Sequence, residues 1–190
     1  MILPIYLYGQ PILRKTTKDI SQDYPDLKTL LDNMFETMYK AEGVGLAAPQ
    51  IGRDDRILIV DLDPYAKDDP AFKDFKKVFI NANIIERDGE EGFIEEGCLS
   101  VPNIHEKVSR KNRIRIQYVD ENFQPHDEVY EGQRARVIQH EYDHLEGVLF
   151  VDHLSGIRKQ MIRSKLNKML NGEVDCSYKI KAVSKKGLRN

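Results

Sequence analysis

Two histidines stand four residues apart in the segment H-E-Y-D-H, which runs from His140 to His144. On an α-helix this spacing turns the second side chain by only about 40° from the first, so both imidazoles can bind one metal ion. Glu141 then lies beside that ion, where its carboxylate can take a proton from water without being a ligand. The segment therefore predicts a metal site for hydrolytic chemistry. A surface helix that carries two histidines by chance is the alternative.

Such a site needs a third ligand, and the residues that follow His144 do not supply one. Metalloproteases with a third histidine carry it six residues further on, where this chain has Phe150. His153 comes nine residues after His144, which turns it about 180° around a continuing helix and away from the ion. Asp152 is better placed to cap the next helix. These positions are disfavoured as the third ligand, and we expect it to come from elsewhere in the sequence.

Cys98 is the remaining soft donor. It lies in residues 96–100, E-G-C-L-S, after a predicted strand and turn. A free cysteine is more often a small buried apolar residue, and that alternative stays open. Two imidazoles and one thiolate leave the fourth position of a tetrahedral ion open to water, which is typical of catalytic sites. Cys176 has no comparable surroundings, and we expect it to be incidental.

Residues 43–50, G-V-G-L-A-A-P-Q, form a third unusual segment. Its two glycines and two alanines allow another backbone to approach closely. No lysine with Ser or Thr follows the glycines, which argues against a phosphate-binding loop. Gln50 ends the run with an amide that could donate a hydrogen bond to a developing oxyanion. A helix end followed by a tight connection is the other interpretation.

The elements that position these residues follow from the hydrophobic periodicity. Apolar residues at helical spacing predict three helices, at residues 27–38, 137–145 and 154–170. Runs of β-branched residues predict three strands, at residues 56–60, 78–85 and 113–119. This order indicates an α+β fold with mostly antiparallel strands. The polar residues 61–77 are expected to form a loop between two strands.

Composition indicates an ordinary globular protein, since 41% of the 190 residues are hydrophobic and 32% are charged. The formal net charge is −2, but residues 157–190 hold ten Lys or Arg against two Asp or Glu. We therefore expect a catalytic domain over residues 1–170 and a basic, loosely attached tail over residues 171–190. No apolar stretch is long enough to span a membrane and no signal-peptide pattern is present, so the cytoplasm is the expected location.

Taken together, residues 43–50, 96–100 and 139–144 resemble the three motifs of the peptide deformylases, G-x-G-L-A-A-x-Q, E-G-C-L-S and Q-H-E-x-D-H, in the same order. The resemblance implies antiparallel sheets packed around a central helix that carries H-E-x-x-H, with a further helix toward the C-terminus. It also implies a hydrolase that removes the formyl group from the N-terminal methionine of new bacterial polypeptides and releases formate.

The resemblance also assigns roles to individual residues. The metal ligands would be Cys98, His140 and His144. Water or hydroxide on the metal would attack the formyl carbon, and Glu141 would accept the water's proton and pass it to the departing amine. The side-chain amide of Gln50 and the backbone N–H of Leu99 would stabilise the oxyanion.

Substrate contacts are implied in the same way. The backbone of Val44, Gly45 and Leu99 would pair with the extended peptide. The methionine side chain would occupy an apolar pocket formed by Val44 and Val137. Arg136 is bulkier and more polar than such a pocket suits, so we expect it to point elsewhere.

The resemblance implies one Fe²⁺ per chain, with Zn²⁺, Ni²⁺ or Co²⁺ able to replace it. The implied partners are N-formylmethionyl nascent peptides, and neither DNA nor a membrane is expected. Residues 157–170 form a basic helix that suggests docking on ribosomal RNA, although a solvent-exposed amphipathic helix explains the same charges.

Two other functions fit parts of the sequence. A zinc metallopeptidase would use the same H-E-x-x-H to cleave peptide bonds, but the absent third His or Glu ligand and the thiol in E-G-C-L-S speak against it. A non-enzymatic RNA-associated module would explain the basic end of the chain but not the three motifs. Hydrolysis of a formylated substrate is the interpretation that uses all of these features.

Overall fold

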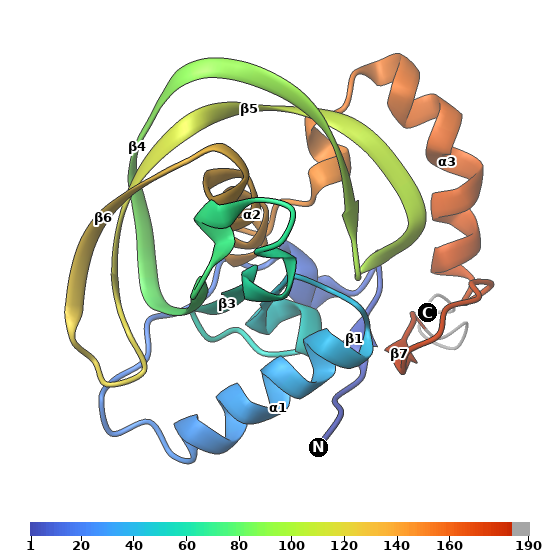
Figure 1. Cartoon of the computed structure of the whole chain (residues 1–190). Helices are drawn as coiled ribbons and strands as arrows, with labels where there is room; N and C mark the ends of the chain where they lie inside the picture. Colours follow the sequence, from blue (N-terminus) through green and yellow to red (C-terminus); the bar gives the residue numbers. More distant parts are fainter. Residues whose placement is uncertain (184–190) are drawn as a thin grey trace.

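A five-stranded antiparallel sheet curves around one helix, and two further helices lie outside it (Figure 1). The computed structural model describes residues 1–183, so residues 184–190 of the expected tail lie outside the described residues. The helices are α1 (Leu27–Lys40), α2 (Gly132–Leu145) and α3 (Gly156–Leu170). The strands are β1 (Ile5–Tyr6), β2 (Gly45–Ala47), β3 (Ile57–Asp61), β4 (Lys76–Cys98), β5 (Val101–Val119), β6 (Pro125–Glu131) and β7 (Ile180–Lys181). This confirms the expected α+β fold around the helix that carries H-E-x-x-H.

The sheet has the order β2-β3-β4-β5-β6, and each neighbouring pair is antiparallel. β4 and β5 form a long hairpin of 23 and 19 residues whose register shifts at several points. Such irregularities bend strands, and Figure 1 shows β4, β5 and β6 arching around α2. The three predicted strands correspond to β3 and to parts of β4 and β5.

α2 is the most enclosed of the three helices, because the curved strands cover it. Ten of its 14 residues are buried, and Ile138 and Tyr142 belong to the same apolar cluster as Phe79 of β4. The helix starts directly after β6 at Gly132, whose φ of 60° is a left-handed conformation that favours glycine. This sharp junction leads the chain from the edge of the sheet to its concave side.

α1 and α3 confirm the two other predicted helices. The buried face of α1 consists of Leu31, Met34, Thr37 and Met38. α3 begins slightly later than expected, after Ser155, whose side chain caps its first turn. Asp152 lies in a separate 3₁₀ turn before α3 and accepts a hydrogen bond from the backbone N–H of Leu149. Within residues 1–183, no helix combines the length and apolar character that crossing a bilayer requires.

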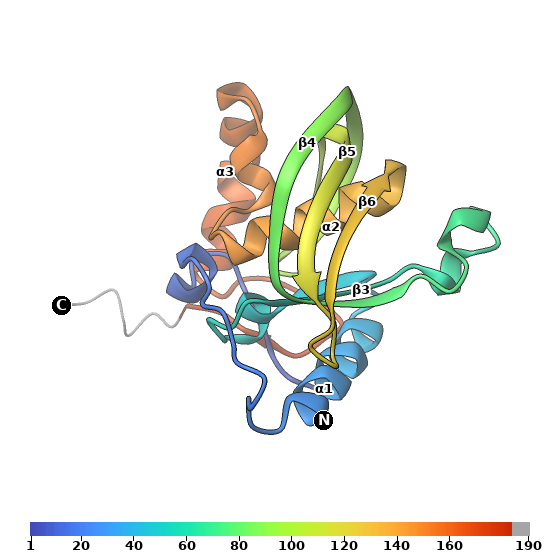
Figure 2. The same ribbon diagram turned by 90° about the vertical axis from the view of Figure 1, so that its left-hand side faces the viewer.

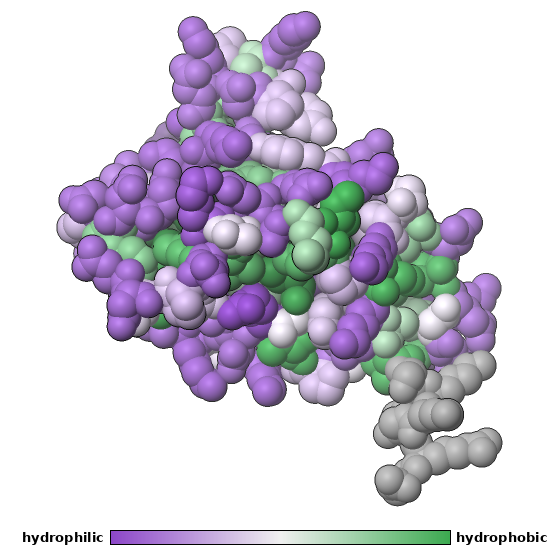
Figure 3. Space-filling model, turned by 90° about the horizontal axis from the view of Figure 1, so that it is seen from below, coloured by the Kyte–Doolittle hydropathy of each residue, from purple (hydrophilic) through white to green (hydrophobic). Residues whose placement is uncertain are grey.

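The described part of the chain after α3, residues 171–183, is attached to the core, in contrast to the expected loose tail. β7 pairs in parallel with β1, and Val174, Tyr178 and Ala182 pack on a cluster of apolar residues from the N-terminal half. Seen from the side of α1 and the β1–β7 pair, hydrophobic residues form a band across the surface (Figure 3). The alternation of apolar residues in this short segment explains its attachment. The division into residues 1–170 and 171–190 stays a prediction.

The expected loop at residues 61–77 is more structured than its polarity indicates. It contains two 3₁₀ turns, Asp63–Tyr65 and Pro70–Phe72, and it buries Phe72 and Phe75 in the main apolar cluster. Figure 2 shows this segment at the far end of the β3–β4 pair, on the side away from α3. The two phenylalanines therefore fix an otherwise polar connection to the core.

Replacing Phe79 by Ala is expected to lower the free energy of unfolding by about 3–5 kcal/mol. The Phe79 ring is fully buried and its centroid lies 4.4 Å from that of Tyr118, so its removal leaves a cavity. Urea unfolding followed by circular dichroism measures the change. Phe93→Ala is the control in the same strand, since Phe93 is 69% exposed, and it should cost less than about 0.5 kcal/mol. Equal losses would contradict the position of Phe79 in the core.

Candidate metal centre

α2 and the end of β4 bring together the three residues predicted as metal ligands. Donor atoms of Cys98, His140 and His144 all lie within 4.8 Å of one another. Cys98 Sγ is 3.3 Å from His144 Nε2, and the centroids of the two imidazole rings are 5.3 Å apart. Among residues 1–183 this is the only such group of His, Cys, Asp or Glu donors.

The chemistry of the cluster fits a metal ion. Both histidines are buried and Cys98 is half-buried, so two nitrogen donors and one thiol converge away from bulk water. This is the donor set of catalytic zinc sites and also suits neighbouring transition metals. Beside the cluster, Glu141 Oε2 is buried and has no hydrogen-bond partner among the described residues. An orphaned polar atom of this kind is typical of a functional site.

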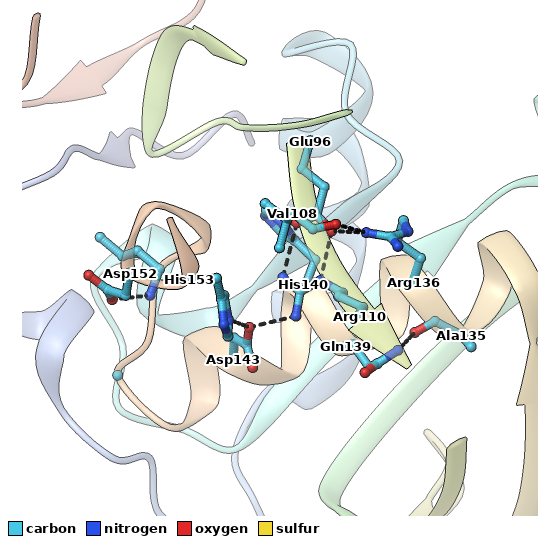
Figure 4. Close-up of polar contacts among 12 residues, drawn as sticks. Glu96, Val108, Arg110, Ala135, Arg136, Gln139, His140, Asp143, Asp152 and His153 are labelled. Atoms are coloured by element: carbon cyan, nitrogen blue, oxygen red, sulfur yellow. Dashed lines mark hydrogen bonds and ion pairs between the residues drawn. The ribbon is translucent and has the colours of Figure 1, made fainter. Parts of the chain in front are cut away.

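Glu96 fixes the orientation of His140. Its carboxylate lies 3.0 Å from His140 Nδ1 and accepts hydrogen bonds of 2.7 Å from both Arg110 and Arg136 (Figure 4). Burial alone would raise the pKa of Glu96, but the hydrogen bonds from His140 and Arg110 hold that pKa well below its usual range. The ionised carboxylate therefore keeps a proton on Nδ1 of His140 and leaves Nε2 for a metal.

Asp143 extends this network to the residue beside His144. Its carboxylate accepts a hydrogen bond of 2.8 Å from Arg110 and lies 2.7 Å from His153 Nε2 (Figure 4). His153 thus faces Asp143 and not the cluster, which agrees with the expected direction of its side chain. A single guanidinium on β5, that of Arg110, therefore binds Asp143 of the H-E-x-x-H segment directly and His140 through Glu96.

Glu141 lies between the cluster and β2. Burial raises the pKa of its carboxyl group to about 7, so at neutral pH this group can both accept and release a proton. Its position depends on Gly45, because a Cβ atom at that residue would lie 2.5 Å from Glu141 Oε1. Any side chain at position 45 would displace the carboxylate, which explains why glycine is required there.

Gln50 and Leu99 both lie next to Cys98 and line the same cavity. The Gln50 side-chain oxygen accepts a hydrogen bond of 2.8 Å from the Ala47 backbone N–H, while its Nε2 lies 3.5 Å from Cys98 Sγ. The amide is therefore turned with its donor end toward the thiol. Leu99 directly follows Cys98 in the turn between β4 and β5.

A cavity of about 460 Å³ adjoins the cluster. It is lined by eight of the nine residues with a predicted role, namely Val44, Gly45, Gln50, Cys98, Leu99, Val137, His140 and Glu141. His144, the ninth, is fully buried beside Cys98. The structure therefore brings all nine residues to one continuous site.

Several residues at this site were not predicted from the sequence. Arg110 carries no recognisable local signal, and its partners lie in other elements. Cys176 lines the cavity together with Ser177 and Tyr178 but is not part of the donor cluster, so the expectation that it is incidental stays a prediction. Arg136 borders the cavity, but its guanidinium is turned to Glu96 and to the Gly92 carbonyl oxygen at 2.7 Å.

Comparisons with known proteins agree on one family. Residues 2–160 match the family model described as polypeptide deformylase. The peptide deformylase of Christiangramia forsetii is 50% identical over 196 aligned residues that cover all of both chains. A crystal structure of the Legionella pneumophila peptide deformylase has 39% identity and a TM-score of 0.78, and the match covers 88% of this chain and 95% of that one. The Met-Ala-Ser-bound class I type b peptide deformylase of Acinetobacter baumannii has 34% identity and a TM-score of 0.73, over 81% and 99% of the two chains.

Replacing Glu96 by Gln is expected to weaken binding of Zn²⁺ about 10–100-fold, because His140 loses the anion that orients it. The same change should lower the free energy of unfolding by about 3–5 kcal/mol, because Arg110 and Arg136 lose a buried charge partner. Competition with a chromophoric chelator and urea unfolding measure the two effects. Glu95→Gln, at the exposed neighbouring residue, is the control, and unchanged metal affinity in Glu96→Gln would refute the orienting role.

Proposed function

Because this chain belongs to the polypeptide deformylase family, we propose that Cys98, His140 and His144 form the metal centre of its deformylase reaction. The protein is an enzyme, a metal-dependent hydrolase that removes the formyl group from the N-terminal methionine of newly made polypeptides and releases formate. The observation that carries the assignment of residues is the convergence of the three donors beside the buried carboxyl group of Glu141.

We propose Fe²⁺ as the metal, one ion per chain, with Zn²⁺, Ni²⁺ or Co²⁺ able to occupy the same ligands. Two imidazoles and a thiolate are compatible with all four ions, and the resemblance of the three motifs to the family favours iron. When bound, such an ion acts as a Lewis acid that polarises a carbonyl group and lowers the pKa of water.

Glu141 is the proposed carrier of the proton. Its carboxylate accepts a proton from the attacking water and then delivers it to the amine of methionine as the C–N bond breaks. A pKa of about 7 suits both steps, because it lies near the operating pH. The contact with Gly45 holds the carboxylate at the edge of the cavity, where both transfers would take place.

Gln50 and Leu99 are the proposed donors to the oxyanion that forms on the formyl oxygen. The side-chain amide of Gln50 is pre-oriented by its bond to Ala47, so no reorganisation is needed when charge develops. The Leu99 backbone N–H would supply the second hydrogen bond. Both residues line the cavity next to Cys98, which supports this assignment.

The peptide is proposed to lie along the cavity with its methionine side chain against Val44 and Val137. Val137 is buried on the first turns of α2, and Val44 packs on the main apolar cluster. The backbone of Val44, Gly45 and Leu99, which line the cavity, would pair with the extended substrate, in the case of Leu99 through its N–H because its carbonyl oxygen is bonded to Tyr178. The peptide Met-Ala-Ser bound to the Acinetobacter relative supports a peptide ligand of this kind.

A zinc metallopeptidase that cleaves peptide bonds is not favoured. His153 faces Asp143, and the third soft donor of the cluster is a cysteine from β4. The matching family model and the relatives described above are all deformylases.

Replacing Glu141 by Ala is expected to lower formate release by about 10²–10⁴-fold, because the proton carrier is lost. The variant should retain its metal, since Cys98, His140 and His144 are unchanged. Enzyme purified without oxygen would be analysed for metal content and assayed with a formylated methionyl peptide. Metal analysis of the same wild-type sample tests the proposal of Fe²⁺.

Glu131→Ala, at an exposed carboxylate just before α2, is the control for that variant and should keep full activity. Cleavage within the peptide chain without formate release by the wild type would refute the proposed reaction. Full activity of Glu141→Ala would refute the role of Glu141 alone.

We propose that the enzyme acts in the cytoplasm, where nascent chains emerge, and that α3 docks on ribosomal RNA. Lys159, Arg163, Lys165 and Lys168 of α3 are exposed. Arg158 is instead paired with Glu106 at 2.8 Å and holds α3 against β5. Ile162 and Met169 of α3 are buried in an apolar cluster, so the helix is anchored on one side and basic on its exposed side, which suits phosphate contacts.

Replacing Lys159, Arg163 and Lys165 together by Gln is expected to weaken co-sedimentation with ribosomes and to reduce the slope of log affinity against log salt by about 3. The triple replacement of Lys15, Lys40 and Lys73 by Gln removes the same charge from exposed positions elsewhere and should have little effect. Equal losses in both variants, or none in either, would contradict docking through α3.

A further inference from the structure

The Leu99–Ser100 turn, which carries a proposed oxyanion donor, has little support from its own hairpin. It is a two-residue connection, since Cys98 of β4 pairs directly with Val101 of β5. Neither turn residue is among those with a positive φ. The turn is therefore neither type I′ nor type II′, the two types whose twist matches that of a two-residue hairpin. The register also shifts just before it, between Glu96 and Cys98. The conformation of this turn therefore depends on contacts from other segments.

Both carbonyl groups of the turn accept hydrogen bonds from outside the hairpin. The Tyr8 backbone N–H donates to the Ser100 carbonyl oxygen at 2.8 Å. The Tyr178 hydroxyl donates to the Leu99 carbonyl oxygen at 2.7 Å. These two donors come from segments that are joined to each other, because β1 pairs with β7. The turn is thus held by a unit built from two distant parts of the chain.

The segment that carries Tyr178 is itself anchored on both sides. Asn103 Nδ2 donates to the Asp175 carbonyl oxygen at 2.8 Å, and Gln10 Nε2 donates to the Ala182 carbonyl oxygen at 2.8 Å. Between these anchors, residues 176–178 line the cavity. These two hydrogen bonds therefore hold in place the segment that carries the Tyr178 hydroxyl.

The side chain of Leu99 is held as well. It packs so closely on Gly43 that a Cβ atom at that glycine would lie 2.9 Å from Leu99 Cδ1. With the side chain fixed by Gly43 and the carbonyl group fixed by Tyr178, rotation of the Leu99 backbone is restricted at both points. The N–H group of the same residue is thereby kept in one direction.

We propose that Tyr178 is a positioning residue for deformylation, and that its hydrogen bond to the Leu99 carbonyl keeps the Leu99 N–H directed at the oxyanion. This rests on the proposed function of Leu99. Tyr178 lies beyond residues 2–160, the part of the chain matched by the family model. Because the direction of an N–H donor matters most once negative charge has formed, the effect belongs to the transition state and not to peptide binding.

The test is Tyr178→Phe in the metal-loaded enzyme, which removes the hydroxyl and keeps the ring. We expect kcat for a formylated methionyl tripeptide to fall on the order of tenfold, with KM changed by less than about twofold. Metal content and melting temperature should stay as in the wild type. Hydrogen exchange at the amides of residues 99–101 should become faster, since the turn loses one of its two outside bonds.

Tyr6→Phe is the matched control, because the Tyr6 hydroxyl accepts a hydrogen bond of 3.2 Å from Lys181 Nζ in the same β1–β7 unit without contacting the turn. It should leave kcat and the exchange rates unchanged. An unchanged kcat in Tyr178→Phe overturns the proposal, and so does a raised KM with unchanged kcat. If the wild type releases no formate, the proposed function fails, whereas the exchange rates still decide whether Tyr178 holds the turn.

Discussion

The burial of one ionised carboxylate, that of Glu96, determines how the helix and the sheet meet. Removing such a charge from water costs several kcal/mol unless donors surround it. Here His140 and Arg136 come from α2 and Arg110 comes from β5, so the carboxylate on β4 is bonded to both neighbours. Sliding or rotation of α2 against the hairpin would leave a buried charge unpaired. This constraint fixes the imidazole of His140 relative to the strand that carries Cys98.

The shape of the sheet follows from the same requirement. Glu96 and Cys98 reach α2 only because β4 and β5 bend over the helix, and the shifts of register along that hairpin allow the bend. Arg110 lies on the returning strand, where it binds Glu96 and also Asp143 of the helix. The bent hairpin therefore brings Cys98 to the two histidines, and the buried ion network holds the hairpin and α2 in that arrangement.

The sequence predicted the parts of this site that depend on local spacing. The two histidines of α2 share a face because they are four residues apart, and the helical pattern located α2 correctly. The strand pattern found only residues 78–85 of β4 and 113–119 of β5, so it missed that Cys98 belongs to the same long strand. The partners of Glu96 could not be predicted, because Glu96 and His140 are 44 residues apart and no local pattern encodes their contact. The approach of Tyr178 to Leu99, across 79 residues, is likewise a product of the folded chain. Its basic surroundings in the sequence had suggested only a tail.

Two glutamates at this site illustrate how surroundings assign chemistry to identical groups. Glu96 and Glu141 are both buried, and burial by itself raises the pKa of each. The hydrogen bonds and charges of His140 and Arg110 reverse this effect at Glu96 and keep its carboxyl group ionised. Glu141 has an oxygen without any partner among the described residues, so the effect of burial prevails and its pKa stays near neutrality. Surroundings that push the pKa values of two carboxyl groups apart in this way suit one group to a structural role as an anion and the other to proton transfer. That separation supports the proposal that Glu141 transfers the proton while Glu96 orients His140.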